Sequence, residues 1–159
     1  MSARAAWRLE TLGFDQVFDY ADGKLDWMAA GLPTEGTNAT KPRAGDLARK
    51  DTPTCDLTEA LAEVRDRVRG LGWDAVVVIN EERIVLGLLR SRELDLDGHL
   101  LIEQVMRPGP STFRPFASIM EMARFFEEHK VDSSPITASD GRLVGLLQQK
   151  DVIVPGPSL

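Results

Sequence analysis

The sequence predicts a mixed α+β fold, in which two β-α-β-β-α units pack as a pseudo-twofold pair and carry a small N-terminal helix and strand. The main observation is an internal repeat, because segment 84–94 (IVLGLLRSREL) reappears 58 residues later as 142–152 (RLVGLLQQKDV). The offset then holds without a gap between 44–94 and 102–152. Since neither copy has enough apolar residues to close a core alone, the two copies are expected to pack against each other.

Each copy shows the same order of elements. Apolar residues follow helical spacing at Leu57, Leu61, Val64 and Val68 in the first copy, and at Ile119, Met122, Ala123 and Phe126 in the second. Two strands follow each helix, at 74–79 and 84–89 and then at 134–137 and 143–147. Asp140-Gly141 is a strong tight-turn signal between the second pair. The connector between the copies is short, which places them side by side.

Composition excludes several classes of function. The chain has 19 Lys and Arg against 25 Asp and Glu, a formal charge of −6, so it offers no basic face for nucleic acid. Apolar runs such as 75–79 are far shorter than the ~20 residues that span a bilayer, and no signal-peptide core is present. One cysteine and two histidines leave little material for a metal site. We therefore expect a cytoplasmic protein that binds neither nucleic acid nor membrane.

Three motifs recur at the same offset and resemble one family. The segment Gly145-Leu-Leu-Gln-Gln-Lys-Asp151 is similar to the pattern Gly-apolar-x-Thr/Ser-x-x-Asp of cystathionine-β-synthase (CBS) domains, and segments 102–108 and 131–136 resemble the openings of that unit and of its hairpin. The resemblance implies a tandem pair, with units at 44–94 and 102–154 joined by connector 95–101. It also implies that AMP, ADP or ATP, or else S-adenosylmethionine or NAD, binds between the copies without a metal.

The resemblance assigns candidate ligands by motif position. A carboxylate in the first turn of a helix can accept hydrogen bonds from ribose hydroxyls, while backbone N–H groups attract phosphate. Asp151 becomes the ribose ligand of the second copy, with Gln148 at the Thr/Ser position. Glu93 and Arg90 hold the same places in the first copy. The other candidates line the adenine slot (Thr112, Pro135 and Ile136) or offer cations to phosphate (Arg107, Lys150, Arg114 and Arg142).

A structural interpretation competes with this one. Asp151 and Glu93 also stabilise a helix N-terminus electrostatically, and the family's hydroxyl is replaced by Gln148 and Arg90, which are poor caps. Under that interpretation the pair is a dimerisation scaffold with its cleft filled by side chains.

Residues 1–36 lie outside the repeat. A helix over residues 5–13 is expected to run into a strand at 16–20, and the segments 23–27 and 31–33 resemble the C-terminal end of a rhodanese domain. That family's catalytic cysteine has no counterpart here, and Cys55 is expected to be a small packed side chain. Residues 37–43 are interpreted as a linker.

The resemblance to CBS domains implies a regulatory, non-enzymatic module. It would bind an adenosine nucleotide between the copies, form a homodimer, and signal occupancy to a regulated protein partner. The alternatives are the interaction scaffold that binds no ligand and, remotely, a residual sulfurtransferase.

Overall fold

The structure is a computed structural model that describes residues 3–30, 32–36 and 41–152. The N-terminal region holds α1 (Ala3–Thr11) and α2 (Gly23–Ala29). The first copy holds α3 (Ala44–Leu47), β1 (Thr54–Cys55), α4 (Leu61–Gly70), β2 (Ala75–Ile79), β3 (Val85–Arg90) and α5 (Ser91–Leu94). The second copy holds α6 (Ile102–Val105), β4 (Arg107–Pro108), α7 (Ile119–His129), β5 (Ser133–Thr137), β6 (Leu143–Gln148) and the 3₁₀ turn η1 (Gln149–Asp151). The predicted α+β class is confirmed.

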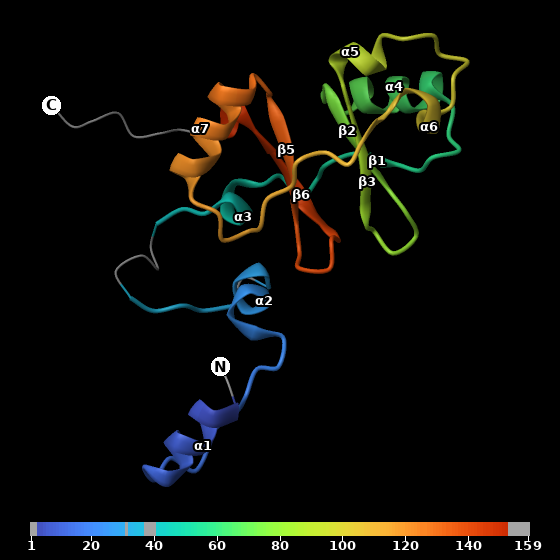
Figure 1. The fold of residues 1–159 in the computed structure, drawn as a ribbon. Helices are drawn as coiled ribbons and strands as arrows, with labels where there is room; N and C mark the ends of the chain where they lie inside the picture. Colours follow the sequence, from blue (N-terminus) through green and yellow to red (C-terminus); the bar gives the residue numbers. More distant parts are fainter. Residues whose placement is uncertain (1–2, 31, 37–40, 153–159) are drawn as a thin grey trace, which may run out of the picture.

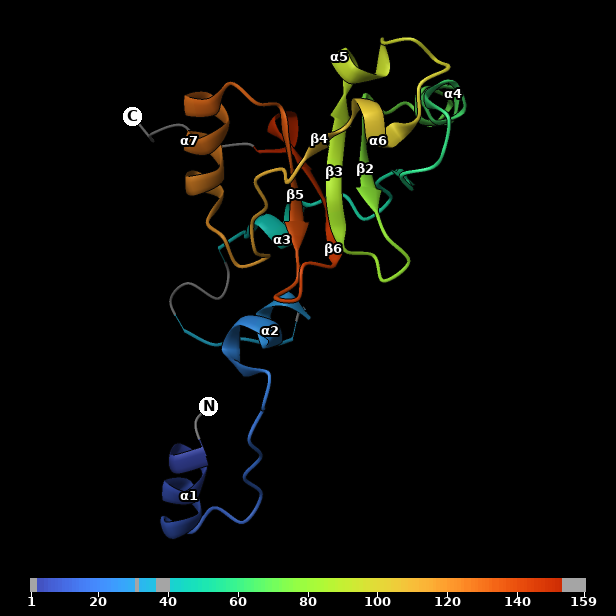
Figure 2. The same ribbon diagram turned by 45° about the vertical axis from the view of Figure 1, so that its right-hand side comes forward.

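Two sheets form the centre of the molecule, with helices on their outer sides (Figures 1 and 2). The larger sheet has the order β1-β2-β3-β4, with β1 parallel to β2 and the other pairs antiparallel. In the second sheet β5 and β6 form an antiparallel hairpin, and single bridges join Phe113 to Ile136 and Arg49 to Leu146. Both hairpins contain the same register shift, after Val78 and after Ile136. The repeat seen in the sequence therefore extends to backbone pairing.

The leading segment of each copy packs into the other copy. Strand β4 of the second copy pairs with β3 of the first, and Arg49 of the first copy exchanges two backbone hydrogen bonds with Leu146 of β6, at 2.9 and 3.1 Å. Ile102 of α6 is buried in the core of the first copy, and Ala44 of α3 in the core of the second. The sequence repeat and the packed unit are therefore different sets of residues, and the exchange holds the pair together.

The repeated glycine of the motif makes this exchange possible. A Cβ atom on Gly145 would lie 2.7 Å from the carbonyl oxygen of Arg49, and one on Gly87 would lie against the sulfur of Met106. Both glycines are buried where the leading segment of the other copy crosses the second strand of the hairpin. Only a residue without a side chain permits backbones to approach so closely.

The two long helices bury one face each. In α4 the buried residues are Leu61, Val64 and Val68, and in α7 they are Ile119, Met122 and Phe126. The sequence places the start of the first helix at Leu57, which is too early. Asp56 accepts hydrogen bonds from the backbone and hydroxyl of Thr58 at 2.8 and 2.7 Å, so residues 56–60 form a turn before α4 begins.

The N-terminal region differs from its prediction. The strand expected at 16–20 is wrong: the segment is extended but has no strand partner in the described residues, and the chain instead forms α2 after it. Tyr20 and Trp27 pack edge to face at 5.2 Å, and Tyr20 donates a hydrogen bond of 2.8 Å to Asp26. Asp26 in turn accepts a hydrogen bond of 3.5 Å from Ser139, which ties α2 to the β5–β6 turn.

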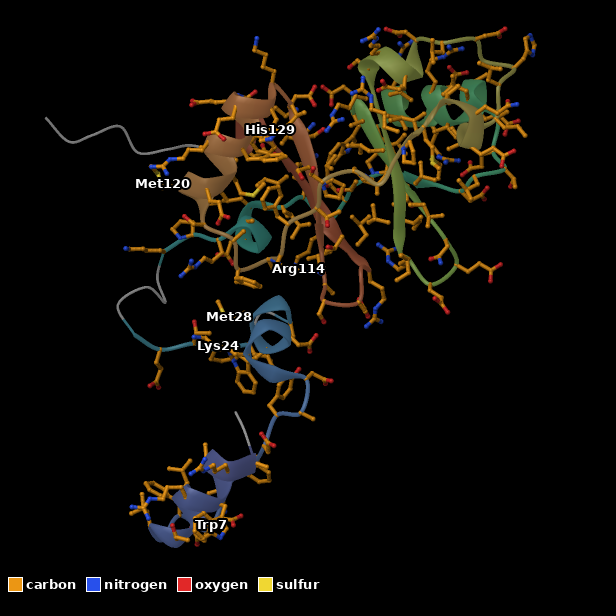
Figure 3. All side chains as sticks on the ribbon, in the orientation of Figure 1. Trp7, Lys24, Met28, Arg114, Met120 and His129 are labelled. Atoms are coloured by element: carbon orange, nitrogen blue, oxygen red, sulfur yellow. The ribbon has the colours of Figure 1, made fainter. Side chains whose placement is uncertain are left out.

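Helix α1 projects away from the sheets (Figures 1 and 3), and Trp7 is 62% exposed. Of the predicted linker at 37–43, positions 37–40 lie outside the described residues, as do 153 and 154 at the end of the predicted second unit. None of the helices in the described ranges is long and apolar enough to cross a membrane.

Candidate functional site

The second copy's candidate ligands lie on three adjacent segments. Asp151 is in η1, directly after Gln148 ends β6. Gln148 pairs with the first residue of β5, the strand that holds Pro135 and Ile136. The segment that holds Thr112 runs beside β5, because the N–H of Phe113 donates to the carbonyl of Pro135 at 3.1 Å.

Gln148 is buried and only half satisfied. It is 4% exposed, and its Nε2 donates a hydrogen bond of 3.0 Å to the carboxylate of Asp74 in the first copy. Because an ionised carboxylate only accepts hydrogen bonds, this contact determines which way the amide faces. Oε1 therefore points elsewhere, where it is shielded from solvent and has no hydrogen-bond partner among the described residues.

Asp151 shows the same feature. Its Oδ2 is shielded and, within residues 3–30, 32–36 and 41–152, also lacks a hydrogen-bond partner. The side chain does not cap the 3₁₀ turn in which it lies. The end of β6 thus carries two shielded acceptor atoms that no described donor reaches, and such atoms are uncommon in folded proteins.

Arg49 of the first copy supplies positive charge near Asp151. The pKa of Arg49 is raised, chiefly by its hydrogen bond to Asp51 and further by the charges of Asp51 and Asp151. Its Nη2 lies 2.9 Å from Asp51, and its guanidinium lies 4.0 Å from the ring centre of Trp73. Arg49 and Asp74 are not among the ligands predicted from the sequence. The available signal was their identity with Arg107 and Asp132 at the repeat offset.

At the equivalent place in the first copy, both carboxylate oxygens of Glu93 accept hydrogen bonds. Glu93 is 6% exposed; one carboxylate oxygen accepts the backbone N–H of Arg90 at 3.1 Å, and the other accepts Nε of Arg107 at 2.7 Å. The Arg90 side chain crosses to the second copy, where it donates to Asp132 at 3.0 Å and to the carbonyl of Ser133 at 2.7 Å. Arg107 is therefore paired with a carboxylate of its own chain.

The other predicted phosphate cations divide between the two ends of the β5–β6 hairpin. Lys150 is exposed beside Asp151. Arg142 and Arg114 lie at the far end of that hairpin, where Arg142 pairs with Asp140 at 2.6 Å and Arg114 donates to the hydroxyl of Thr137 at 2.8 Å. Figure 3 shows Arg114 at this end. The structure does not bring these two arginines to Asp151.

Cys55 has no features of a nucleophile. The side chain is 4% exposed, and burial raises the pKa of its thiol to about 12. A thiol with this pKa is protonated at neutral pH, whereas thiol chemistry requires the thiolate. The prediction of a packed side chain is confirmed. Among the described residues no cluster of three His, Cys, Asp or Glu side chains could hold a metal ion.

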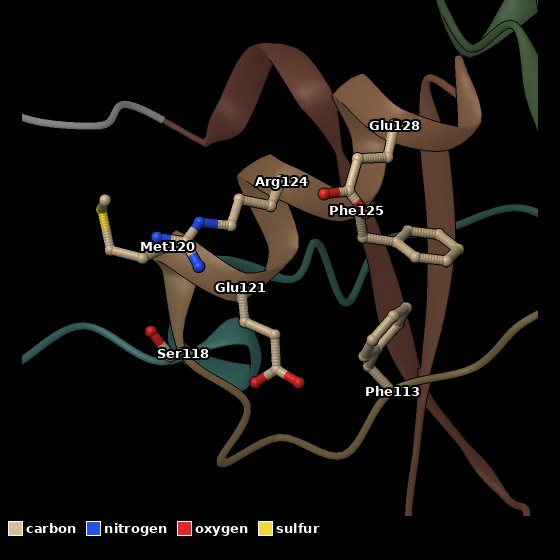
Figure 4. A pocket seen from close by; sticks show the side chains of 7 residues that line it. All are labelled: Phe113, Ser118, Met120, Glu121, Arg124, Phe125 and Glu128. Atoms are coloured by element: carbon tan, nitrogen blue, oxygen red, sulfur yellow. The ribbon is translucent and has the colours of Figure 1, made fainter.

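A separate hollow of about 510 Å³ lies on the outer face of α7 (Figure 4). Phe113 and Phe125 form part of its wall, with their rings edge to face at 4.7 Å, and Glu121, Arg124 and Glu128 line it with charge. None of the predicted nucleotide ligands is among its lining residues. The hollow is therefore distinct from the region around Asp151.

Comparison with known proteins identifies the architecture. Residues 102–154 match the model of the CBS domain family. The chain also superimposes on solved CBS pairs: on CBSX2 bound to AMP with a TM-score of 0.64, at 18% identity over 70% of this chain and 93% of that one, and on the pair of protein MJ0100 bound to 5′-methylthioadenosine and S-adenosylmethionine with a TM-score of 0.65, at 15% identity over the same shares. The fold is that of a CBS pair.

Other similar proteins are matched over only part of their own length. The cytosolic domain of the Mg²⁺ channel MgtE, solved with ATP, matches with a TM-score of 0.65 and 23% identity over 70% of this chain and 47% of that one. An uncharacterised protein of Methanopyrus kandleri is 23% identical over 72% of this chain, and an inosine-5′-monophosphate dehydrogenase of Korarchaeum cryptofilum is 27% identical over 69%. The present chain spans 63% and 23% of these two relatives. The resemblance of residues 1–36 to a rhodanese domain stays a prediction.

Proposed function

We propose that this CBS pair is a regulatory module that binds an adenosine nucleotide of the AMP, ADP or ATP class at the end of β6 and signals its occupancy to a protein partner. One observation carries the proposal: Oε1 of Gln148 and Oδ2 of Asp151 are shielded acceptors without a hydrogen-bond donor among the described residues. Each shielded polar atom left unpaired costs about 1–3 kcal/mol, so a ligand that supplies donors gains what the free protein lacks.

The chemistry of the two atoms favours a ribose. Both are acceptors, and the vicinal hydroxyls of a ribose supply two donors. A phosphate group supplies acceptors only and cannot satisfy either atom. In the proposed complex the sugar faces Gln148 and Asp151, and the phosphates face the nearby cations Lys150 and Arg49.

The solved relatives support an adenosine compound. CBSX2 has been solved with AMP, the cytosolic domain of MgtE with ATP, and the pair of MJ0100 with S-adenosylmethionine and 5′-methylthioadenosine. These ligands share an adenosine unit and differ in what extends from it. S-adenosylmethionine and NAD therefore belong in the same test as the three nucleotides.

A thermal-shift and calorimetric screen tests the proposal. It uses AMP, ADP, ATP, NAD and S-adenosylmethionine, with GMP as the base control and 2′-deoxy-AMP as the sugar control. A ligand at 100 times its Kd should stabilise the protein by about 2.7 kcal/mol, a rise of roughly 5 to 10 °C in Tm. Loss of one hydroxyl donor should weaken binding by about tenfold or more. Absence of any shift up to millimolar concentrations would contradict the proposal.

A specific observation favours a second candidate, a scaffold that binds no ligand. Gln148 and Arg90 stand where the family pattern has a hydroxyl, and both side chains link the two copies, to Asp74 and Asp132 respectively. The scaffold hypothesis predicts a stable assembly with no response to any of these ligands, and indifference of that assembly to Asp151→Ala.

Homodimerisation, a regulated partner and a cytoplasmic location belong to the same proposal. The support is the CBS-pair fold, which the chain shares with the cytosolic domain of MgtE. Sedimentation equilibrium with and without AMP tests the dimer directly. A monomer at micromolar concentrations in both conditions would remove it from the proposal.

A further inference from the structure

We propose that the two copies have unequal sites, so that the chain binds one nucleotide at Asp151 while Glu93, Arg90 and Arg107 fill the first copy's site from within. This inference rests on the proposed function and adds the stoichiometry and the cause of the asymmetry. It follows from three differences between residues at equivalent positions of the repeat.

The first difference is the length of the acidic side chain. Glu93 reaches both the N–H of Arg90 and the guanidinium of Arg107, so both of its carboxylate oxygens are in use. A ribose hydroxyl therefore gains less at Glu93 than at a carboxylate oxygen that has no donor of its own. Asp151 is one methylene shorter, does not cap its own turn, and keeps Oδ2 unpaired.

The second difference concerns the cation that faces the carboxylate. Arg107 binds Glu93 directly at 2.7 Å. Its counterpart Arg49 is held by Asp51 at 2.9 Å and stacks on Trp73. Asp151 acts on Arg49 only through its longer-range charge. The second site therefore keeps positive charge close by without losing its carboxylate to an ion pair.

The third difference lies at the hydroxyl position of the motif. Arg90 carries only donors, and its side chain, 18% exposed, is hydrogen-bonded to Asp132 and Ser133. Gln148 uses its donor on Asp74 and leaves an acceptor over. At these positions both acceptor atoms of the first site already have a donor, whereas the second site has two acceptor atoms that lack a donor among the described residues.

Isothermal titration calorimetry with AMP and with ATP tests the asymmetry on the full chain. The variants are Asp151→Asn and its matched control Glu93→Gln, each checked for folding by circular dichroism and thermal unfolding without ligand. We expect one ligand per wild-type chain, at least about tenfold weaker binding in Asp151→Asn, and a Kd within about twofold of wild type in Glu93→Gln. A double variant, Glu93→Asp with Arg90→Gln, gives the first copy the side chains of the second, and its stoichiometry should rise to two.

The possible failures are distinguishable. No heat from either nucleotide with the wild-type protein contradicts the proposed function itself. Two ligands per wild-type chain, or a loss in Glu93→Gln as large as in Asp151→Asn, overturns the asymmetry while leaving nucleotide binding intact. A folded double variant that still binds a single ligand overturns the assignment of closure to Glu93 and Arg90.

Discussion

The regions around Glu93 and Asp151 occupy equivalent positions of the repeat, in an α-helical turn and a 3₁₀ turn respectively, and differ in how their carboxylates are hydrogen-bonded. Both carboxylates follow the last strand of a hairpin at the same offset, and both lie near an arginine of the other copy's leading segment. In the first region every carboxylate oxygen has a donor, while in the second Oδ2 of Asp151 has none among the described residues. The two copies of the repeat can therefore differ in whether the carboxylate at this position is fully hydrogen-bonded.

The comparison also shows how little sequence change separates the two states. One methylene distinguishes Glu93 from Asp151, and one charge distinguishes Arg90 from Gln148. The following predictions use equivalent positions of the repeat as each other's controls.

The largest expected effect concerns the two motif glycines. Gly145→Ala drives a Cβ against backbone atoms of Arg49, which cannot yield without breaking the exchange, whereas Gly87→Ala meets chiefly the movable side chain of Met106. We expect losses in the free energy of unfolding of about 3 kcal/mol for Gly145→Ala and about 1 kcal/mol for Gly87→Ala, measured by urea denaturation. Equal losses in the two variants would show that the structure tolerates a Cβ atom equally well at Gly145 and at Gly87.

The two carboxylates should have different effects on the stability of the ligand-free protein. Glu93→Ala removes the partner of a helix-capping N–H and of Arg107, and should cost about 2 kcal/mol. Asp151→Ala removes an unpaired acceptor, and should leave stability unchanged or raise it by up to about 1 kcal/mol. Denaturant melts of both variants without nucleotide provide the measurement. A clear loss in Asp151→Ala would mean that the carboxylate is already satisfied.

Cys55 and Phe113 are equivalent positions, and the thiol adds a pH dependence that the aromatic ring lacks. The folded thiol has a pKa of about 12 against an ordinary value of 9.0, so between these pH values the unfolded chain binds fewer protons than the folded one. Stability should therefore fall as pH rises above 9, by about 1.4 kcal/mol per pH unit from this group. The difference between wild type and Cys55→Ala in denaturant melts at pH 8, 9.5 and 10.5 isolates it. The same dependence of the unfolding free energy on pH in wild type and in Cys55→Ala would contradict the raised pKa of the Cys55 thiol.

The smallest effects are expected at the two arginines. Arg107→Gln leaves the buried carboxylate of Glu93 with a weaker partner and should cost about 1 kcal/mol. Arg49→Gln loses an ion pair with the exposed Asp51 and the stacking on Trp73, and should cost about 0.5 kcal/mol. The same melts, repeated at 1 M salt, should reduce both costs. A larger loss in the free energy of unfolding for Arg49→Gln than for Arg107→Gln would contradict the expectation that Arg107 is the more strongly paired arginine.

Much of the fold could be predicted from the sequence because the patterns that indicate it are local. The hairpins at 75–90 and 133–148 were predicted within a residue or so, since their apolar runs and turn residues depend only on neighbours in the chain. The strand expected at 16–20 failed for a non-local reason: an extended segment becomes a strand only where another strand offers hydrogen bonds. The early start given to α4 failed because Asp56 and Thr58 form a turn that apolar spacing does not show.

The candidate site was predicted only in part. The structure places Asp151 and Gln148 at the end of β6, with Thr112, Pro135 and Ile136 on neighbouring segments. Whether any of them binds a nucleotide stays a prediction. Motif position could not show that Arg114 and Arg142 form their contacts at the far end of the β5–β6 hairpin, or that Arg107 is bound to Glu93. Those contacts depend on the direction of each side chain.

The sequence by itself determined the duplication, the order of elements within each copy and the position of the motif glycines, since periodicity and turn chemistry are properties of short segments. The tertiary structure alone decided that the leading segments change places and that one carboxylate is satisfied while its counterpart is not. Those outcomes depend on atoms far apart in the chain meeting within about 3 Å, a distance at which one methylene determines whether a hydrogen bond forms.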